Sequence, residues 1–383
     1  MAYRTEISAV RGILTHRFEL TRGEIVTAKP KVALAMVSAL CLAAMSACGS
    51  SSGSGPGTGD DLSGQKLVYV NYGGDSMKAA QKAWLDPFRK KTGVQIATDS
   101  PSDPAKVKAM VDAGNPTWDV IDLDTASGAN GCGTMFAKRS ETGVDIKDVD
   151  PKYVTDECGV PILVQAVALV YNTAKFGGSP PTKITDFMDT AKFPGQRLIF
   201  NYALGGLDPI LLASGVAPDK LYPLDTDRAA ASVRALGKNL TLEATLAQQT
   251  QDLESGNFSM CLCYVGRAAL SAQNGAPIGV VWDKAWEAWD AVYAIKGSKA
   301  PKAQSALLNY LATPEAQSAF TEQLPYGPTT PASKPQVPAE FKKWLPQDNL
   351  AQMGPQGEVV SDLKWWTANS DKAFAAWTAM TAG

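Results

Sequence analysis

Two aspartates at the end of one apolar run are the side chains best placed to do chemistry. The run Trp118–Leu123 (WDVIDL) reads as a buried strand, and it brings Asp122 and Asp124 to its carboxyl end. In open α/β sheets such ends face the ligand crevice. Carboxylates placed there could hold a cation or serve as a catalytic acid and base. The alternative is that they cap a helix beginning near Ala126.

A second candidate group combines tryptophans and acids within one short stretch. A desolvated ammonium over an aromatic ring gains roughly 2 kcal/mol, and a carboxylate offsets its lost hydration. The stretch therefore fits a cation cage, and the alternative is a partly buried helix or loop at a domain edge. Its members are Trp282, Asp283, Trp286, Glu287, Trp289 and Asp290. Among them we expect Trp289 to contact a ligand.

Histidine usage excludes whole classes of enzyme. The one histidine is His16, which lies in an N-terminal leader, so the exported protein has none. Ser-His-Asp and Cys-His hydrolases and histidine-ligated metal sites are then unavailable. We expect no metal, no cofactor and no enzymatic activity; the enzyme class that stays open is a cell-surface glycosidase built on carboxylates alone.

The leader resembles that of an exported lipoprotein. Lys29 and Lys31 precede the apolar stretch Val32–Ala44, and small residues stand just before Cys48. Thirteen apolar positions fall short of the roughly 20 that a membrane-spanning helix needs. We therefore expect residues 1–47 to be a leader, Cys48 to carry lipid, and the Gly/Ser-rich residues 48–63 to be a flexible tether. The protein would then sit outside the cytoplasm, anchored to the cell membrane or in a periplasm.

The charge of the exported chain argues against two kinds of partner. Residues 1–47 carry six of the 36 Lys and Arg and three of the 38 Asp and Glu, so the rest has a net charge of −5. This mildly acidic chain has no Lys/Arg cluster, which argues against binding nucleic acid or an anionic membrane surface. We expect a monomer that meets the membrane through its lipid alone.

Four cysteines follow the lipidation site. We expect Cys132 and Cys158 to form a disulfide, because both lie in loop-like segments of one lobe. Cys261 and Cys263 stand two apart in a strand-like run and share a face. They either bridge each other or remain buried thiols.

The elements expected along the chain divide into two α/β regions. Strands are expected at 66–71, 94–97, 118–123, 197–200, 259–265, 279–282 and 291–295, and helices at 76–92, 107–113, 184–191, 208–213, 228–239, 301–320 and 362–380. The apolar run Pro161–Asn172 is long enough to cross between lobes, and Ala291–Ile295 returns. We expect residues 64–165 plus 293–330 to form lobe 1, and 166–292 plus 331–383 to form lobe 2.

Short segments in this order resemble the extracellular solute-binding proteins of ABC importers, in the spermidine/putrescine-binding branch. The segments are Asn71–Gly74, Trp118–Val120, the ECGV motif around Cys158, Val170–Asn172, Lys192–Gly195, Trp289 before Ala294-Ile295, and Tyr326–Thr329. The resemblance implies a periplasmic-binding-protein fold of type II, with discontinuous lobes that bend at a hinge and close on a solute in the cleft. An ABC permease in the membrane would receive that solute.

The resemblance also implies a set of ligand-binding residues. Together with the strand-end aspartates they are Tyr72, Asp122, Asp124, Asp208, Tyr264, Trp289 and Tyr326. Asp208 has the alternative role of a helix N-cap before Pro209. The expected ligand is a polyamine or a related cationic or zwitterionic compound. Ala291 stands where the family has an acid two residues after the tryptophan, so an amino-acid-like or anionic solute is the alternative.

Overall fold

The computed structural model describes residues 61–354 and 357–382. The expected leader and the lipidation site Cys48 lie outside these residues. Leu62 is buried and its backbone N–H donates to the Thr92 carbonyl (2.8 Å), so packing begins just before the expected end of the tether. No helix in the described part of the chain has the length and apolarity needed to span a bilayer.

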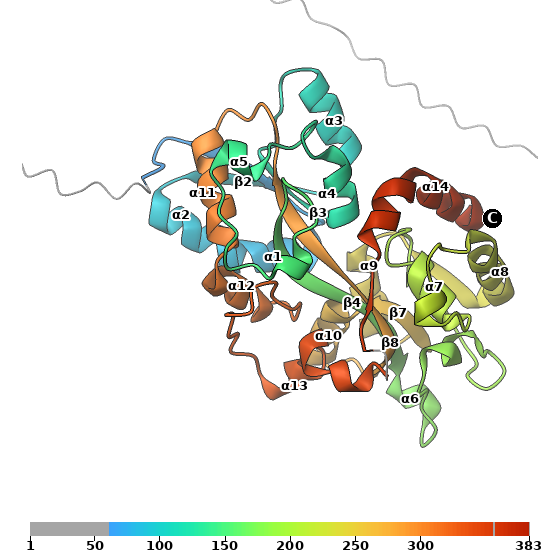
Figure 1. Cartoon of the computed structure of the whole chain (residues 1–383). Helices are drawn as coiled ribbons and strands as arrows, with labels where there is room; N and C mark the ends of the chain where they lie inside the picture. Colours follow the sequence, from blue (N-terminus) through green and yellow to red (C-terminus); the bar gives the residue numbers. More distant parts are fainter. Residues whose placement is uncertain (1–60, 355–356, 383) are drawn as a thin grey trace, which may run out of the picture. The chain divides into compact units, whose positions relative to one another are not determined.

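The strands of the described residues form one mixed sheet (Figure 1). They are β1 (Lys66–Val70), β2 (Gln95–Asp99), β3 (Val120–Asp124), β4 (Val160–Asn172), β5 (Arg197–Phe200), β6 (Leu240–Glu243), β7 (Met260–Tyr264), β8 (Ile278–Ala294) and β9 (Val359–Val360). Their order is β2-β1-β3-β8-β4-β7-β5-β6, with β9 beside β8. Each end is parallel, β1 pairing with β2 and β3, and β5 with β6 and β7. The sheet therefore has two α/β halves, one at each end.

Two long strands join these halves. β4 has 13 residues and β8 has 17, and they pair with each other antiparallel. β3 pairs with β8 on one side and β7 with β4 on the other. The β4–β8 register shifts between Pro161 and Leu163 and again between Val167 and Leu169. A bulge of this kind bends a strand locally, so these are the places where the connection can flex.

Helices cover both halves of the sheet. They are α1 (Gly74–Ala80), α2 (Asp86–Thr92), α3 (Pro104–Asp112), α4 (Thr125–Gly131), α5 (Arg139–Thr142), α6 (Thr173–Phe176), α7 (Leu207–Ala213), α8 (Thr226–Leu236), α9 (Leu246–Ser255), α10 (Val265–Gln273), α11 (Pro301–Leu311), α12 (Pro314–Thr321), α13 (Ala339–Lys342) and α14 (Leu363–Thr381). One core includes Trp84, Leu308 and Phe320 at the β1 end, and another includes Leu211, Trp366 and Trp377 at the β5 end.

Three sequence predictions about elements were wrong. The expected helix 184–191 is a short 3-10 helix over Ile184–Met188. The expected helix 301–320 is divided into α11 and α12, because Pro314 has no N–H to continue the ladder and Thr313 caps a new helix through Ala316 N. The expected separate strands 279–282 and 291–295 are parts of the continuous β8. The tryptophan-rich stretch between them is therefore strand, paired with β4, and not the helix or loop that was its alternative.

Candidate functional site

Three buried aspartates meet where β3 and β8 run side by side. Asp122 and Asp124 lie on β3, and Asp124 is the register partner of Asp290 on β8. Side chains two apart on a strand share a face, as do directly opposed residues. All three aspartates are 3–4% exposed. The fold therefore concentrates three carboxyl groups in a small buried region.

Some oxygen atoms of these carboxyl groups accept hydrogen bonds from the protein, and one has no partner. Asp124 accepts from Ser127 N (2.8 Å) at the start of α4, which confirms the capping alternative for this residue, and from the Tyr202 hydroxyl (3.1 Å). Asp290 Oδ1 accepts from Gln165 Nε2 (2.9 Å). Asp122 Oδ1 is buried with no hydrogen-bond partner. Among the described residues no Lys or Arg forms an ion pair with any of the three.

Burial and mutual repulsion keep these groups from ionising together. Burial raises the pKa of Asp122, and the Asp124 charge raises it further. Burial likewise raises the pKa of Asp290 well above its usual range, with Asp122 and Asp124 adding to the shift. Burial also raises the pKa of Asp124, which its hydrogen bonds oppose. An ammonium group placed among them would supply a positive charge and so favour their ionised forms.

Tyrosines surround the acidic cluster. The Tyr72 hydroxyl oxygen accepts from Asp124 N (2.9 Å). Burial raises the pKa of Tyr264, and the charges of Asp290, Tyr326 and Asp124 raise it further. These tyrosines are therefore close neighbours of the carboxyl groups, and their ring faces and hydroxyls suit an organic cation.

A buried arginine lies near Tyr326. Arg267, near the start of α10, is fully buried. Its Nη2 donates to Ser76 Oγ (2.9 Å), its Nη1 lies 3.4 Å from Asp75 Oδ2, and its Nε has no partner. Burial raises the pKa of Tyr326, with Arg267 opposing the shift and Asp290 adding to it. Tyr326 thus lies within electrostatic reach of both a guanidinium and the acidic cluster.

Contacts across the two halves show that they are closed on each other. Tyr202 follows β5 and reaches Asp124 on β3, and Arg267 reaches Ser76 on α1. Asn130 Nδ2 of α4 donates to Ser370 Oγ of α14 (3.0 Å). α14 lies against α4 (Figure 1). The acidic cluster and Arg267 are therefore enclosed between the halves.

The structure gathers five of the seven expected ligand-binding residues. Tyr72, Asp122, Asp124, Tyr264 and Tyr326 lie at or beside the acidic cluster. Whether they contact a ligand stays a prediction.

Asp208 has its own protein partners, and its charge also raises the pKa of Tyr264. It is fully buried in the first turn of α7, and its Oδ1 accepts from the Tyr222 hydroxyl, which also accepts from Trp366 Nε1 (3.2 Å). Burial raises the pKa of Asp208 to about 7, and these hydrogen bonds oppose the shift.

Trp289 lies on the opposite face of β8 from Asp290. Its Nε1 donates to the Tyr153 carbonyl (2.9 Å), and its ring meets the Tyr153 ring edge to face at 5.3 Å. The side chain is 5% exposed and belongs to a hydrophobic core. These contacts favour a packing role.

Three residues of the enclosed region were not predicted as ligand-binding residues. They are Tyr202, Gln165 and Asp290. Asp290 was weighed in the tryptophan-rich stretch, but the strand alternation that separates it from Trp289 also turns it toward Asp122 and Asp124. Tyr202 follows a strand, as Tyr72 does, so its place after β5 was the available signal.

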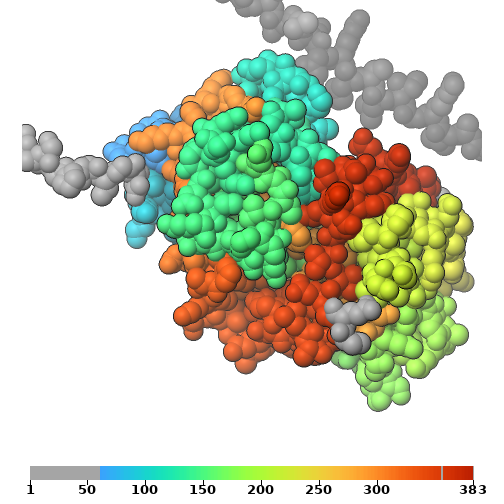
Figure 2. All heavy atoms as spheres, viewed as in Figure 1, coloured from blue at the N-terminus to red at the C-terminus, as the bar shows by residue number. Residues whose placement is uncertain are grey.

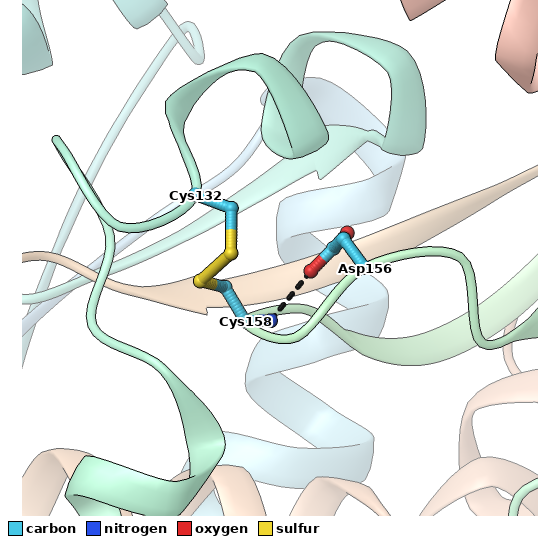
Figure 3. A group of neighbouring side chains, drawn as sticks. All are labelled: Cys132, Asp156 and Cys158. Atoms are coloured by element: carbon cyan, nitrogen blue, oxygen red, sulfur yellow. Dashed lines mark hydrogen bonds between the residues drawn. A yellow bond between two sulfur atoms is a disulfide. The ribbon is translucent and has the colours of Figure 1, made fainter.

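The expected disulfide between Cys132 and Cys158 is present, with Cα atoms 5.6 Å apart. Cys261 and Cys263 are also bonded to each other. Figure 3 shows Asp156 beside the first disulfide, where its Oδ1 accepts from Cys158 N (2.6 Å). These three side chains are close enough to share a metal ion, but both sulfurs are committed to the disulfide and cannot act as thiolate ligands.

Comparisons with known proteins agree with this architecture. A model of the bacterial extracellular solute-binding protein family matches residues 83–347. The gamma-aminobutyric acid-binding protein of Pseudomonas aeruginosa is 28% identical over 330 residues, covering 82% of this chain and 91% of that protein.

Two solved structures from Agrobacterium tumefaciens, each 27% identical to this chain, differ in how well they superpose. The binding protein AgtB of strain R10, in complex with agropinic acid, gives a TM-score of 0.75 and covers 83% of this chain and 99% of that protein. AttC of strain C58, in an open unliganded conformation, gives 0.59 and covers 82% and 99%. The better fit to the liganded protein agrees with the closed halves seen here.

Proposed function

Because the chain belongs to the bacterial extracellular solute-binding protein family, we propose that it captures an amino-acid-like zwitterion between its lobes. The lobes would close on the solute and present it to an ABC permease. The proposal rests on one arrangement. A buried acidic cluster without a cation lies within electrostatic reach of Tyr326, as does a buried guanidinium whose Nε has no partner.

Each end of the site suits one end of such a ligand. An ammonium among Asp122, Asp124 and Asp290 would replace repulsion by ion pairing, with tyrosine rings alongside. A carboxylate at Arg267 would accept from Nε, which has no partner. A solute with both groups, separated by a few carbon atoms, satisfies both ends.

Two named relatives support a solute that carries a carboxylic acid over a polyamine, and one of them supports a zwitterion. The Pseudomonas aeruginosa relative is a gamma-aminobutyric acid-binding protein, and AgtB was solved with agropinic acid. A polyamine would satisfy the acidic cluster but place a cationic end toward Arg267, which is unfavourable in a buried site. The amino-acid-like solute, the alternative that the sequence left open, is therefore favoured over the polyamine.

The remaining expectations about the protein's setting form part of the same proposal. Cys48 would carry lipid and residues 48–63 would tether a monomer to the outer surface of the cell membrane. The lobes would comprise 64–165 plus 293–330 and 166–292 plus 331–383. A tether raises the local concentration of the binding protein at its permease without a new contact. Family membership makes the protein extracytoplasmic and a binder of solutes rather than an enzyme.

Calorimetric titration of the exported chain, purified without refolding, tests the ligand class. The probes are gamma-aminobutyrate, butylamine without the carboxylate, butyrate without the ammonium, and putrescine with two ammonium groups. We expect gamma-aminobutyrate to bind most tightly and each truncated probe to lose roughly 10- to 150-fold, as for a lost charged hydrogen bond. Putrescine binding more tightly than gamma-aminobutyrate would refute the zwitterion proposal.

An arginine variant separates the two ends of the site. Arg267→Gln should weaken gamma-aminobutyrate to about the level of butylamine while leaving butylamine nearly unchanged. Exposed Arg89, paired with Asp86 on the surface, offers the matched control Arg89→Gln, which should change neither affinity. An equal loss for both probes in Arg267→Gln would show that Arg267 holds the lobes closed rather than binding a carboxylate.

A further inference from the structure

A cavity lies against the opposite face of β8 from Asp290. It has a volume of about 450 Å³, within the range of small-molecule sites, and includes Lys152, Tyr153, Glu287 and Glu358 in its lining. Glu287 shares its face of β8 with Trp289, whereas Asp290 points the other way. In Figure 2 the green surface around residue 150 adjoins the orange-red surface of residues 325–350, the two segments that supply most of the wall.

The chemical centre of this cavity is a buried carboxyl group, which a bound cation would favour in its ionised form. Glu287 is 4% exposed, and its Oε1 has no hydrogen-bond partner. Glu358 stands beside it, with Lys152 Nζ 3.9 Å from Glu358 Oε1. Burial and the neighbouring Glu358 raise the pKa of Glu287 to about 9, and Lys152 opposes the shift. Within the described residues no Lys or Arg pairs directly with Glu287, so the cavity wall holds one buried acid that lacks a cationic partner of its own.

The rest of the wall identifies the chemical class that fits. Four prolines line part of it, at positions 328, 331, 335 and 346, together with Val337 and Leu345. The polar residues Thr330, Ser333, Lys342, Gln347 and Asp348 also line it, so Lys342 and Asp348 add one charge of each sign. The Tyr153 ring adds an aromatic face. A divalent metal needs about six oxygen ligands, more than two carboxylates give. An ammonium on a compact apolar body would pair with Glu287 and fill the proline-lined space.

We propose that this cavity behind the hinge strands is a second ligand site, which binds a small primary amine through Glu287. Glu358 and the Tyr153 ring would flank the ammonium, and the prolines would enclose the apolar body. Its wall includes residues that precede β4, residues of β8, and residues that follow α12 and α13. The bound amine would therefore contact the connection on which lobe closure depends.

Calorimetric titration of the exported chain with benzylamine tests the proposal. We expect wild type to bind benzylamine, and Glu287→Gln, which keeps the side-chain volume, to weaken it roughly 10- to 100-fold. Asp290→Asn, on the other face of β8, should retain the benzylamine site. Glu287→Gln should in turn keep its gamma-aminobutyrate affinity, so failure of the second site and failure of the proposed inter-lobe site give different patterns.

Crystals soaked with 4-bromobenzylamine locate the probe independently of any variant. An anomalous bromine peak among the prolines of the cavity, with the amine at Glu287, supports the proposal. Three outcomes would overturn it. The bromine peak could lie only among the tyrosines between the lobes, or the protein could fail to bind benzylamine. The third is that Asp290→Asn abolishes benzylamine binding while Glu287→Gln retains it.

Discussion

Replacing Asp290 by asparagine should make the ligand-free protein more stable and lower its affinity for the ligand. The asparagine side chain would keep an oxygen for Gln165 Nε2, which donates to Asp290 Oδ1 at 2.9 Å. It would remove one of three buried acidic groups whose ionisation is opposed by burial and by the charges of the others. It would also remove an ionic partner from a bound ammonium. The same substitution therefore moves stability and affinity in opposite directions.

The magnitudes follow from the charge that is lost. A hydrogen bond to a charged group contributes about 1.5–3 kcal/mol, so affinity for gamma-aminobutyrate should fall roughly 10- to 150-fold. The folded pKa of Asp290 is raised above its unfolded value. Its contribution to stability is thus fully present below about pH 4 and is lost as pH rises toward the folded pKa, by about 1.4 kcal/mol for each pH unit between the two pKa values. Asparagine removes this loss.

Scanning calorimetry of ligand-free protein at pH 5, 7 and 8 and titration with gamma-aminobutyrate measure the two effects. Wild type should lose stability across this range more steeply than Asp290→Asn. Asp186→Asn is the matched control, because Asp186 is 5% exposed and accepts from Thr182 N at 2.8 Å outside the proposed site. It should lower stability and leave affinity unchanged. Unchanged affinity together with reduced empty-state stability in Asp290→Asn would refute the reasoning.

Three further changes test the assignments around the site. Asp208→Asn should change gamma-aminobutyrate affinity by no more than about twofold. It should also reduce the loss of folding stability as pH rises through about 7, because the raised pKa of Asp208 causes that loss. Titration and scanning calorimetry at pH 6 and 8 measure the two effects. Trp289→Ala should lower the free energy of unfolding by about 3–5 kcal/mol, as for a core tryptophan, in urea denaturation; an unchanged stability with lost ligand binding would restore it to the site. Replacing Cys132 and Cys158 together by serine should cost about 3.5 kcal/mol in the chain-entropy model for their separation of 26 residues, and peptide mapping without reductant should find these two joined in wild type.

Local pattern was enough to find the main elements and part of the site. The unbroken apolar run ending at Asp122 and Asp124 predicted β3, because a strand buried on both faces has few polar positions to interrupt it. The run Pro161–Asn172 likewise predicted the crossing strand β4. Both are cases in which the buried segment and its chemistry are adjacent in sequence.

The partners of β8 could not be read in the same way. Its residues 278–294 alternate imperfectly between tryptophans, acids and alanines, and their strand conformation depends on pairing with β4, more than 100 residues earlier. The role of Asp290 follows from its register with Asp124. Long-range register is a property of the assembled sheet, so the local sequence favoured Trp289 over its neighbour.

Arg267 illustrates a different limit. Next to Gly266, its sequence context fits both a ligand contact and a structural ion pair. The Cβ that Gly266 lacks would lie 2.2 Å from the Tyr326 ring, so this glycine allows the tyrosine to lie against the start of α10. That approach joins segments about 60 positions apart. It brings the guanidinium near the acidic cluster, and spacing along the chain does not reveal it.

The two register shifts between β4 and β8 bear on the energetics of capture. Because bending is localised at Pro161–Leu163 and Val167–Leu169, most backbone hydrogen bonds between the strands can persist while the lobes rotate. Opening would then have a small intrinsic backbone cost, and empty protein would sample both forms. Moving such an equilibrium from 1:99 to 99:1 takes about 5.5 kcal/mol of preferential binding. If the ligand-free protein already favours the closed form, less preferential binding free energy is needed to close it. Substitutions at these bulges should therefore change ligand affinity without contacting the ligand.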